Sequence, residues 1–267
     1  MKLLMLDMDG TLLTNDKSVT SKTRECLLGL KKRGIKIGIA TGRPVFNVKR
    51  ALIKYNLEGI IDYIVGLNGV EIGDLEMDVV QLQQKITSDM TRDICFKIKD
   101  TDFNMITYTY EDGVFARFDE PRVHRLCTNL QLPLMEYDFA CDEQTWNKVL
   151  ITRNYPFSKD ECEWLLALNN EQYHGFITDI DCFEIVNSAV SKASGIQVLC
   201  HKMGITMDEV VAFGDSGNDV DMLRAVGISV AMGNAADVVK SVAKFVTLTN
   251  EEDGIVYFVE KYMEGRV

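Results

Sequence analysis

The feature that most constrains the fold is a series of short apolar runs that alternate with amphipathic helical segments. The run "LLMLD" (3–7) is continuous rather than alternating, which is typical of a strand covered on both faces. Helical spacing follows over 20–33, then a second run over 35–41, a new helix from Pro44, and a third run over 63–69. Strand, helix, strand, helix, strand predicts a parallel sheet of the doubly wound α/β class.

The pattern changes in the middle of the chain and then resumes. Between about 80 and 185 the β segments look antiparallel, and Glu111-Asp112-Gly113 is a hairpin signal between 104–110 and 114–118. Further strands are expected over 146–153, 173–180 and 182–187, and helical stretches near 87–99 and 158–170. The sequence therefore predicts core segments 1–80 and 187–267 around an inserted α+β domain, 81–186.

The second core segment repeats the first pattern. We expect a helix over 191–204, a strand over 209–215, a short helix over 218–227, strands over 228–232 and 245–249, and a last helix over 252–263. These elements extend the same parallel sheet.

Three of the apolar runs end in a polar cluster. The first ends at Asp7 in "DMDGT", the second at Thr41 in "TGRP", and a later one at Asp215 in "GDSGND". Because ligands bind outside the carboxyl ends of the strands in open α/β sheets, we expect these segments to meet at one edge. Asp7, Asp9, Asp215 and Asp219 would then lie together.

Four carboxylates in a small volume need a cation, since like charges side by side are costly. No thiol or imidazole motif lies beside them, and hard oxygen ligands favour Mg²⁺. Thr41-Gly42 offers a hydroxyl and a backbone amide that can hold an anion. Lys192 lies at the start of a predicted helix, where amides and the helix dipole favour an anion. The sequence therefore predicts a magnesium ion together with a phosphoryl group.

Charge and cysteine usage narrow the class of protein. The 267-residue chain has a net charge of -11, which argues against nucleic acid as a main partner. Its seven cysteines are scattered without zinc-type spacing, as expected for reduced thiols. Asp7 and Asp9 interrupt an N-terminal apolar stretch that is too short for a signal peptide, and no run approaches the ~20 residues of a membrane span. We expect a cytoplasmic protein.

The motifs together resemble the haloacid dehalogenase superfamily of phosphohydrolases. "DMDGTLL" resembles the first motif of that family, Thr41-Gly42-Arg43 the second, Lys192 the third, and "GDSGND" the fourth. Their order and spacing are similar to the Cof-like branch (type IIB), in which a cap domain is inserted between the second and third motifs. The resemblance extends over the whole chain.

The resemblance implies a mechanism. Asp7 would attack phosphorus to form an aspartyl-phosphate, and Asp9 would protonate the leaving alcohol and then take a proton from water. Mg²⁺ would bind Asp7, the backbone carbonyl of Asp9 and Asp215, with support from Asp219. The phosphoryl group would be held by Thr41, the Gly42 amide, Lys192 and Asn218.

Several assignments stay open at this stage. Asn68-Gly69 follows a predicted strand and either lines the site or forms a plain turn, and Arg43 either contacts phosphate or pairs with a carboxylate. Candidate substrate contacts in the insert are Tyr108, Tyr110, Arg117, Asp179, Asp181 and Glu184, although a structural or surface role is favoured for each.

The expected activity is hydrolysis of a small phosphorylated metabolite, with sugar phosphates ahead of phosphorylated cofactors. The insert would close over the site and select the substrate. Phosphoryl transfer, as in a phosphomutase, and a regulatory module without turnover are the alternatives. A monomer is expected, because the insert can cover the site without a second subunit.

Overall fold

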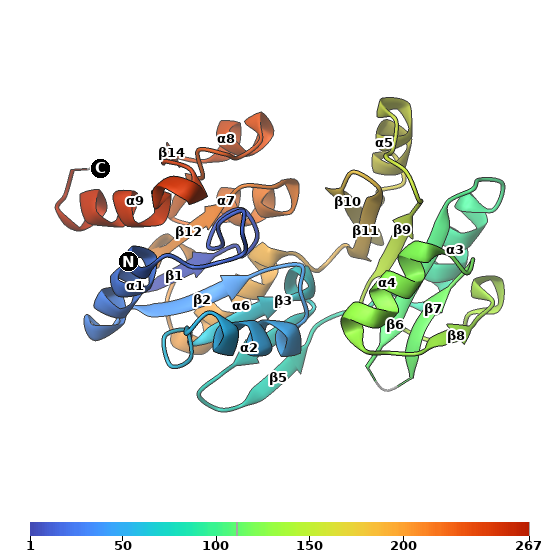
Figure 1. Cartoon of the computed structure of the whole chain (residues 1–267), viewed down its shortest axis with the longest axis horizontal. Coiled ribbons are helices and arrows are strands. Elements are labelled where there is room, and N and C mark those ends of the chain that lie inside the picture. The colour runs from blue at the N-terminus through green and yellow to red at the C-terminus, as the bar shows by residue number, and fades with distance from the viewer. Residues whose placement is uncertain (111, 267) are drawn as a thin grey trace. The chain divides into compact units, whose positions relative to one another are not determined.

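The computed structural model describes residues 1–110 and 112–266. The chain divides into two compact units, each with its own sheet and apolar core (Figure 1). The core unit comprises Met1–Gln83 and Val190–Val267, and the inserted unit comprises Gln84–Ala189.

The core unit is built on a mostly parallel sheet. In the described residues it has eight strands in the order β14-β13-β12-β1-β2-β3-β4-β5. Their bounds are β1 Leu3–Leu6, β2 Lys36–Ala40, β3 Tyr63–Gly66, β4 Glu71–Asp74, β5 Val79–Leu82, β12 Val210–Gly214, β13 Ile228–Ala231 and β14 Phe245–Val246. The strands from β14 to β3 pair in parallel, whereas β4 and β5 pair antiparallel at one edge.

Helices cover both faces of this sheet. Leu4 and Leu6 of β1 join one core with α1 (Ser21–Lys32), α2 (Val45–Lys54) and α9 (Gly254–Met263). Leu3 and Met5 point to the opposite face and join a second core with α6 (Lys192–Met203), α7 (Val220–Ala225) and α8 (Asp237–Val242). This two-sided burial explains why the run 3–6 is continuously apolar, and the doubly wound α/β class is confirmed.

The inserted unit has a mixed sheet, in the order β10-β11-β9-β6-β7-β8. The strands are β6 Asn104–Thr109, β7 Gly113–Ala116, β8 Leu134–Glu136, β9 Val149–Thr152, β10 Tyr173–Asp179 and β11 Cys182–Asn187, and the helices are α3 Ser88–Ile98, α4 Pro121–Leu130 and α5 Lys159–Leu166. An antiparallel pattern was expected throughout, and this is wrong for β7 and β8, which pair in parallel. The α4 helix between them, which the sequence reading did not identify, provides the crossover that parallel pairing requires.

Other differences lie at short elements. The hairpin between β6 and β7 is present, although Glu111 of its expected turn lies outside the described residues. The strand expected over 245–249 is only Phe245–Val246, and the strands β4, β5 and β8 were not identified. Elements of two to four residues have too few positions to show a period.

Two findings bear on location. No helix in the described part of the chain is long and apolar enough to cross a membrane. All seven cysteines are free thiols. The cytoplasmic location stays a prediction.

Candidate active site

The polar clusters lie at the carboxyl ends of three adjacent strands. Asp7 follows β1, Thr41 follows β2, and Asp215 follows β12, and β1 lies between the other two in the sheet. The side chains come from segments more than 30 residues apart, yet parallel pairing brings them to one edge, as the alternation of strands and helices predicts.

Lys192 joins two of the aspartates. It is the first residue of α6, whose N-cap Ser191 accepts a hydrogen bond from the Ser194 backbone. The Lys192 Nζ lies 2.6 Å from Asp7 Oδ1 and 2.6 Å from Asp219 Oδ1, and all three side chains are buried. Such a buried contact is stabilising only when the charges are well paired, so this lysine is a partner of the carboxylates and not a solvated first-turn residue.

Three carboxyl groups lie around one lysine, and burial together with this crowding shifts the pKa values of Asp7 and Asp215. Burial raises the pKa of Asp7 well above its usual range; Lys192 opposes this shift, and the Asp219 and Asp215 charges add to it. Burial also raises the pKa of Asp215 to about 6, against a hydrogen bond from Thr11. Burial alone would lower the pKa of Lys192, but Asp219 and Asp7 outweigh burial and raise it. The cluster has an excess of negative charge.

The donor set of this cluster fits a hard divalent cation. Asp7, Asp215 and Asp219 each offer a carboxylate oxygen, and these oxygens lie within 4.8 Å of one another. A cation with ligand distances of about 2.0–2.6 Å can sit among oxygens at this spacing and would supply the missing positive charge. The three aspartates therefore form a candidate metal site.

The three aspartates differ in which carboxylate oxygens are already hydrogen-bonded. Asp219 uses Oδ1 for Lys192 and Oδ2 for the backbone N–H groups of Asp215 (2.9 Å) and Ser216 (3.0 Å). Lys192 contacts only Oδ1 of Asp7, and Thr11 Oγ1 donates to only Oδ1 of Asp215 at 2.7 Å. Asp219 is thus held as a support for the site, while Asp7 and Asp215 each keep an oxygen for a ligand.

The loop after β1 fits closely against Asp215. Gly10 has a φ of +86°, which favours glycine, and a Cβ at this position would collide with the Asp215 carboxylate. Thr11 is 2% exposed and was missed as a site residue by the sequence reading. Its position inside "DMDGT" was the available signal.

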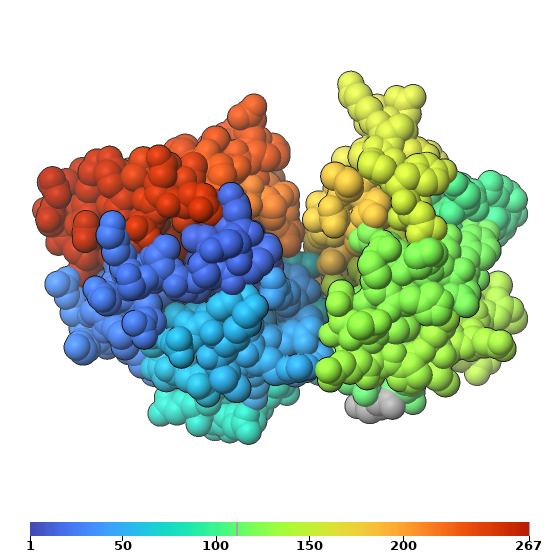
Figure 2. All heavy atoms as spheres, viewed as in Figure 1, coloured from blue at the N-terminus to red at the C-terminus, as the bar shows by residue number. Residues whose placement is uncertain are grey.

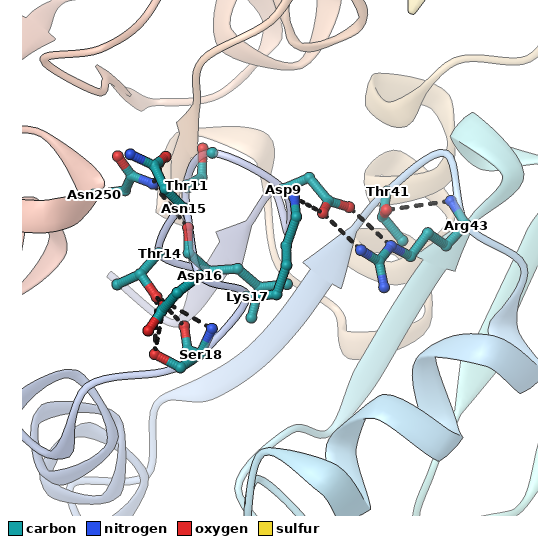
Figure 3. A network of polar contacts seen from close by, with 12 residues as sticks. Asp9, Thr11, Thr14, Asn15, Asp16, Lys17, Ser18, Thr41, Arg43 and Asn250 are labelled. Carbon is teal, nitrogen blue, oxygen red and sulfur yellow. Dashed lines mark hydrogen bonds and ion pairs between the residues drawn. The ribbon is translucent and has the colours of Figure 1, made fainter. Parts of the chain in front are cut away.

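Asp9 is paired with two cations. Arg43 donates to it from Nε (2.8 Å, to Oδ2) and Nη2 (2.6 Å, to Oδ1), and Lys17 Nζ lies 2.8 Å from Oδ1 (Figure 3). Burial alone would raise the pKa of Asp9, but the hydrogen bonds from Arg43 and Lys17 outweigh it and lower that pKa. Of the two roles considered for Arg43, the structure shows pairing with a carboxylate.

The second motif and two asparagines form another part of the edge. Thr41 is buried, and its Oγ1 accepts from the Arg43 backbone N–H at 3.2 Å. The Asn218 Nδ2 donates to Asn68 Oδ1 at 2.9 Å, and a Cβ on Gly42 would lie 3.4 Å from Asn68 Nδ2. Asn68 therefore joins the second and fourth motifs and does more than form a turn. Its φ of 56°, which asparagine tolerates, places it there.

Some of the candidate substrate contacts in the inserted unit have structural partners. Arg117 donates to the backbone carbonyls of Ile98 and Phe103, and Asp181 pairs with Arg122. Glu184 Oε1 lies 3.1 Å from the nearly buried Lys148 Nζ. These contacts show how the unit is held together.

Comparison with known proteins agrees with this geometry. The family of haloacid dehalogenase-like hydrolases matches residues 4–259. The chain belongs to this family. The inserted unit corresponds to the cap of the Cof-like, type IIB branch of this family.

Two relatives of this haloacid dehalogenase-like hydrolase are phosphatases that are named for different substrates. It is 27% identical to the 5-amino-6-(5-phospho-D-ribitylamino)uracil phosphatase YitU of Bacillus subtilis, over 97% of both chains. It is 28% identical to a phosphoglycolate phosphatase of Methanopyrus kandleri, over 98% of this chain and 97% of the other. The solved structure of the phosphatase BT1666 from Bacteroides thetaiotaomicron is 26% identical, with a TM-score of 0.80 over 100% of this chain and 96% of the other. The protein is a phosphatase of small phosphorylated metabolites.

Proposed function

We propose that the chain hydrolyses sugar and polyol phosphates in a Mg²⁺-dependent reaction through a phosphorylated Asp7. The observation that carries this proposal is the buried cluster in which Lys192 contacts both Asp7 and Asp219 at 2.6 Å, beside Asp215. An excess of buried carboxylates is costly in a protein that needs them only for stability, and suits one that binds a cation and a phosphoryl group.

Asp7 is the proposed nucleophile. Its Oδ1 is fixed by Lys192, so its second carboxylate oxygen can attack phosphorus. The bond from phosphorus to the substrate alcohol breaks as the bond to Asp7 forms. When bound at Asp7, Asp215 and Asp219, Mg²⁺ would supply the charge that neutralises the nucleophile and the phosphoryl oxygens.

The phosphoryl oxygens need positioned donors as charge spreads over them. The Thr41 hydroxyl, the Gly42 backbone amide, the Lys192 ammonium and the Asn218 amide lie along the same edge of the sheet and are assigned this role. Lys192 can serve both Asp7 and the phosphoryl group, because an ammonium has three donors and Asp7 and Asp219 use two of them.

Asp9 is the proposed general acid and base. It gives a proton to the leaving alcohol, and then takes one from the water that attacks the aspartyl-phosphate. In the structure its pKa is lowered by Arg43 and Lys17. A phosphate dianion competes for the same cations, so substrate binding draws Arg43 and Lys17 from Asp9 and lets its pKa rise toward the value that an acid needs.

Sugar and polyol phosphates are the proposed substrate class. The support is YitU, whose named substrate carries its phosphate on a ribityl chain. A related chain is named as a phosphoglycolate phosphatase, and phosphoglycolate is a small phosphorylated acid. The assay must therefore include small phosphorylated acids as well as sugar and polyol phosphates.

The test is phosphate release from a panel of phosphorylated sugars, polyols, small acids, nucleotides and cofactors. It is run with Mg²⁺, with a chelator, and with Asp7→Asn. We expect release to need Mg²⁺, to be highest with sugar and polyol phosphates, and to fall by more than about a thousandfold in Asp7→Asn.

Asp208→Asn is the matched control, since Asp208 is exposed and lies near the amino end of β12, away from the strand ends that carry the site. Its activity should equal that of the wild type. If a folded protein releases no phosphate from any compound but exchanges it between sugar positions, the reaction is transfer. If it binds a phosphorylated ligand without either reaction, the protein is a regulator.

A further inference from the structure

The strand β5 leaves one edge of the core sheet open. In the part of the chain that the structure describes, β5 ends the sheet and pairs only with β4. The Gln83 N–H donates to Val70 O across this pair. Hydrogen-bonded positions alternate along antiparallel strands, so Gln81 and Val79 also bond toward β4. The backbone N–H and C=O groups of Val80 and Leu82 therefore point outward, away from β4.

This open edge lacks the features that protect edge strands. Residues 79–83, "VVQLQ", carry no charge and no proline, and Val79, Val80 and Leu82 are 50%, 43% and 50% exposed. The turquoise atoms at the lower border of the core unit in Figure 2 belong to this β4–β5 region. The opposite edge strand, β14, is only two residues long and follows Lys244. Very short or charged edges resist pairing, and β5 has four residues against two in β14, with no charge among its own residues.

We propose that β5 pairs with β5 of a second copy of this chain, antiparallel about a two-fold axis at Gln81. In this register Val80 is opposite Leu82 of the second copy, and Leu82 opposite its Val80. Both residues have outward-pointing backbone groups, so each pair exchanges two hydrogen bonds. Gln81 faces its own symmetry mate in a pair without backbone bonds. The two core sheets become one continuous sheet.

The sequence of β5 favours pairing with a second copy of itself, in the register with the axis at Gln81. A two-fold axis at Gln81 puts the apolar side chains of Val80 and Leu82 opposite each other. These side chains lie on the α2 side of the sheet, because Val80 is paired with Gly73, and a Cβ on Gly73 would contact Val45 of α2. An axis at Val80 would instead put Leu82 opposite Asp78, a charge that is already paired with Lys49. The strand is complementary to itself, which is what an isologous dimer needs.

The first test is the mass of the full chain by sedimentation over a range of concentrations up to the order of 100 µM. The wild type should be a dimer at the upper end. Leu82→Lys should raise the dissociation constant by about tenfold or more, since pairing would bury an unpaired ammonium. Val246→Lys is the matched control, because Val246 is 55% exposed on the other edge strand, and it should leave the dimer intact.

The second test addresses the backbone. Val80→Pro removes an N–H that the single copy does not use, so the β4–β5 pair should remain while the dimer dissociates. Hydrogen exchange gives the same information without a substitution. The Val80 and Leu82 amides should be slowed at high concentration and exchange rapidly at low concentration.

The register is tested with Gln81→Cys. Facing residues in a pair without backbone bonds have Cα atoms about 4.5 Å apart, which suits a disulfide. Mild oxidation should link two copies, and the wild type treated in the same way controls for the native thiols. A wild type that is monomeric at every concentration, or a dimer that survives both Leu82→Lys and Val80→Pro with native circular dichroism, overturns the proposal. These readouts do not depend on phosphatase activity.

Discussion

Both units of the molecule bury charged side chains, but the groups that meet differ between them. In the core unit, Lys192 lies among Asp7, Asp215 and Asp219, three carboxylates to one ammonium. In the inserted unit, Lys148 Nζ contacts Glu184 Oε1 at 3.1 Å, a contact between opposite charges. Burial alone would lower the pKa of Lys148, but Glu184 outweighs it and raises that pKa. The Lys148–Glu184 contact joins opposite charges of the chain itself, whereas the carboxylates of the core cluster outnumber the lysine that they contact and suit a cation from outside.

The largest effect should come from removing the one cation of the core cluster. Without Mg²⁺, Lys192→Met should lower the free energy of unfolding by about 3–5 kcal/mol, because it leaves buried carboxylates without their counter-charge. Millimolar Mg²⁺ should restore part of this loss. Urea unfolding followed by far-UV circular dichroism measures both values. A loss that Mg²⁺ does not reduce would contradict the assignment of the cluster as a metal site.

The corresponding change in the inserted unit should not respond to Mg²⁺. Glu184→Gln removes the carboxylate charge that the buried Lys148 contacts and should cost about 3 kcal/mol. Both tryptophans, Trp146 and Trp164, lie in the inserted unit, so their fluorescence reports its unfolding.

The double variant Lys148→Met with Glu184→Leu is the control for this measurement. It removes both charges and should recover most of the stability. Recovery by Mg²⁺ in the single variant would show that the inserted pair also binds cations, and the contrast between the two units would fail.

A smaller effect is the pH dependence of the core cluster. The raised pKa of Asp215 means that the folded state holds this proton more tightly than the unfolded chain does. Metal-free stability should therefore fall as the pH rises from 3.8 to about 6. Since protons compete with Mg²⁺ for the Asp215 carboxylate, the rise in melting temperature caused by Mg²⁺ should grow through this range.

Differential scanning calorimetry at several pH values, with and without Mg²⁺, measures these shifts. Asp215→Asn should lose most of the pH-dependent response to Mg²⁺. An equal response to Mg²⁺ at pH 5 and pH 8 in the wild type would contradict the role of Asp215.

The smallest effect concerns Asp9, the acid outside the cluster. Arg43→Gln removes the main group that lowers the pKa of Asp9, so the alkaline limb of the pH profile of kcat/KM should move to higher pH. Lys17→Gln should move it less, in the same direction. A fall in kcat/KM without any movement of the limb would show that Arg43 acts only on the substrate.

Much of the site could be predicted from local sequence. "LLMLD" and "EVVAFGD" are apolar because their strands are buried on both faces, and Asp7 and Asp215 follow because the chain leaves the core where each strand ends. The parallel pairing of β1 with β12 then brings the two residues to the same edge. Periodicity and strand order were sufficient to group these residues, and the resemblance to a known family added their proposed roles.

The tertiary structure decided which charges meet. Lys192 is 185 residues from Asp7, and Arg43 is 34 from Asp9, so no local pattern records either contact. The parallel β7–β8 pair and the uncharged edge at β5 likewise depend on which strands become neighbours. The sequence by itself determined where strands end and which polar groups follow them, because burial and backbone hydrogen bonding impose a period on the chain. Which distant side chains come into contact depends on tertiary packing, and packing leaves no periodic pattern in the sequence from which the contacts could be predicted.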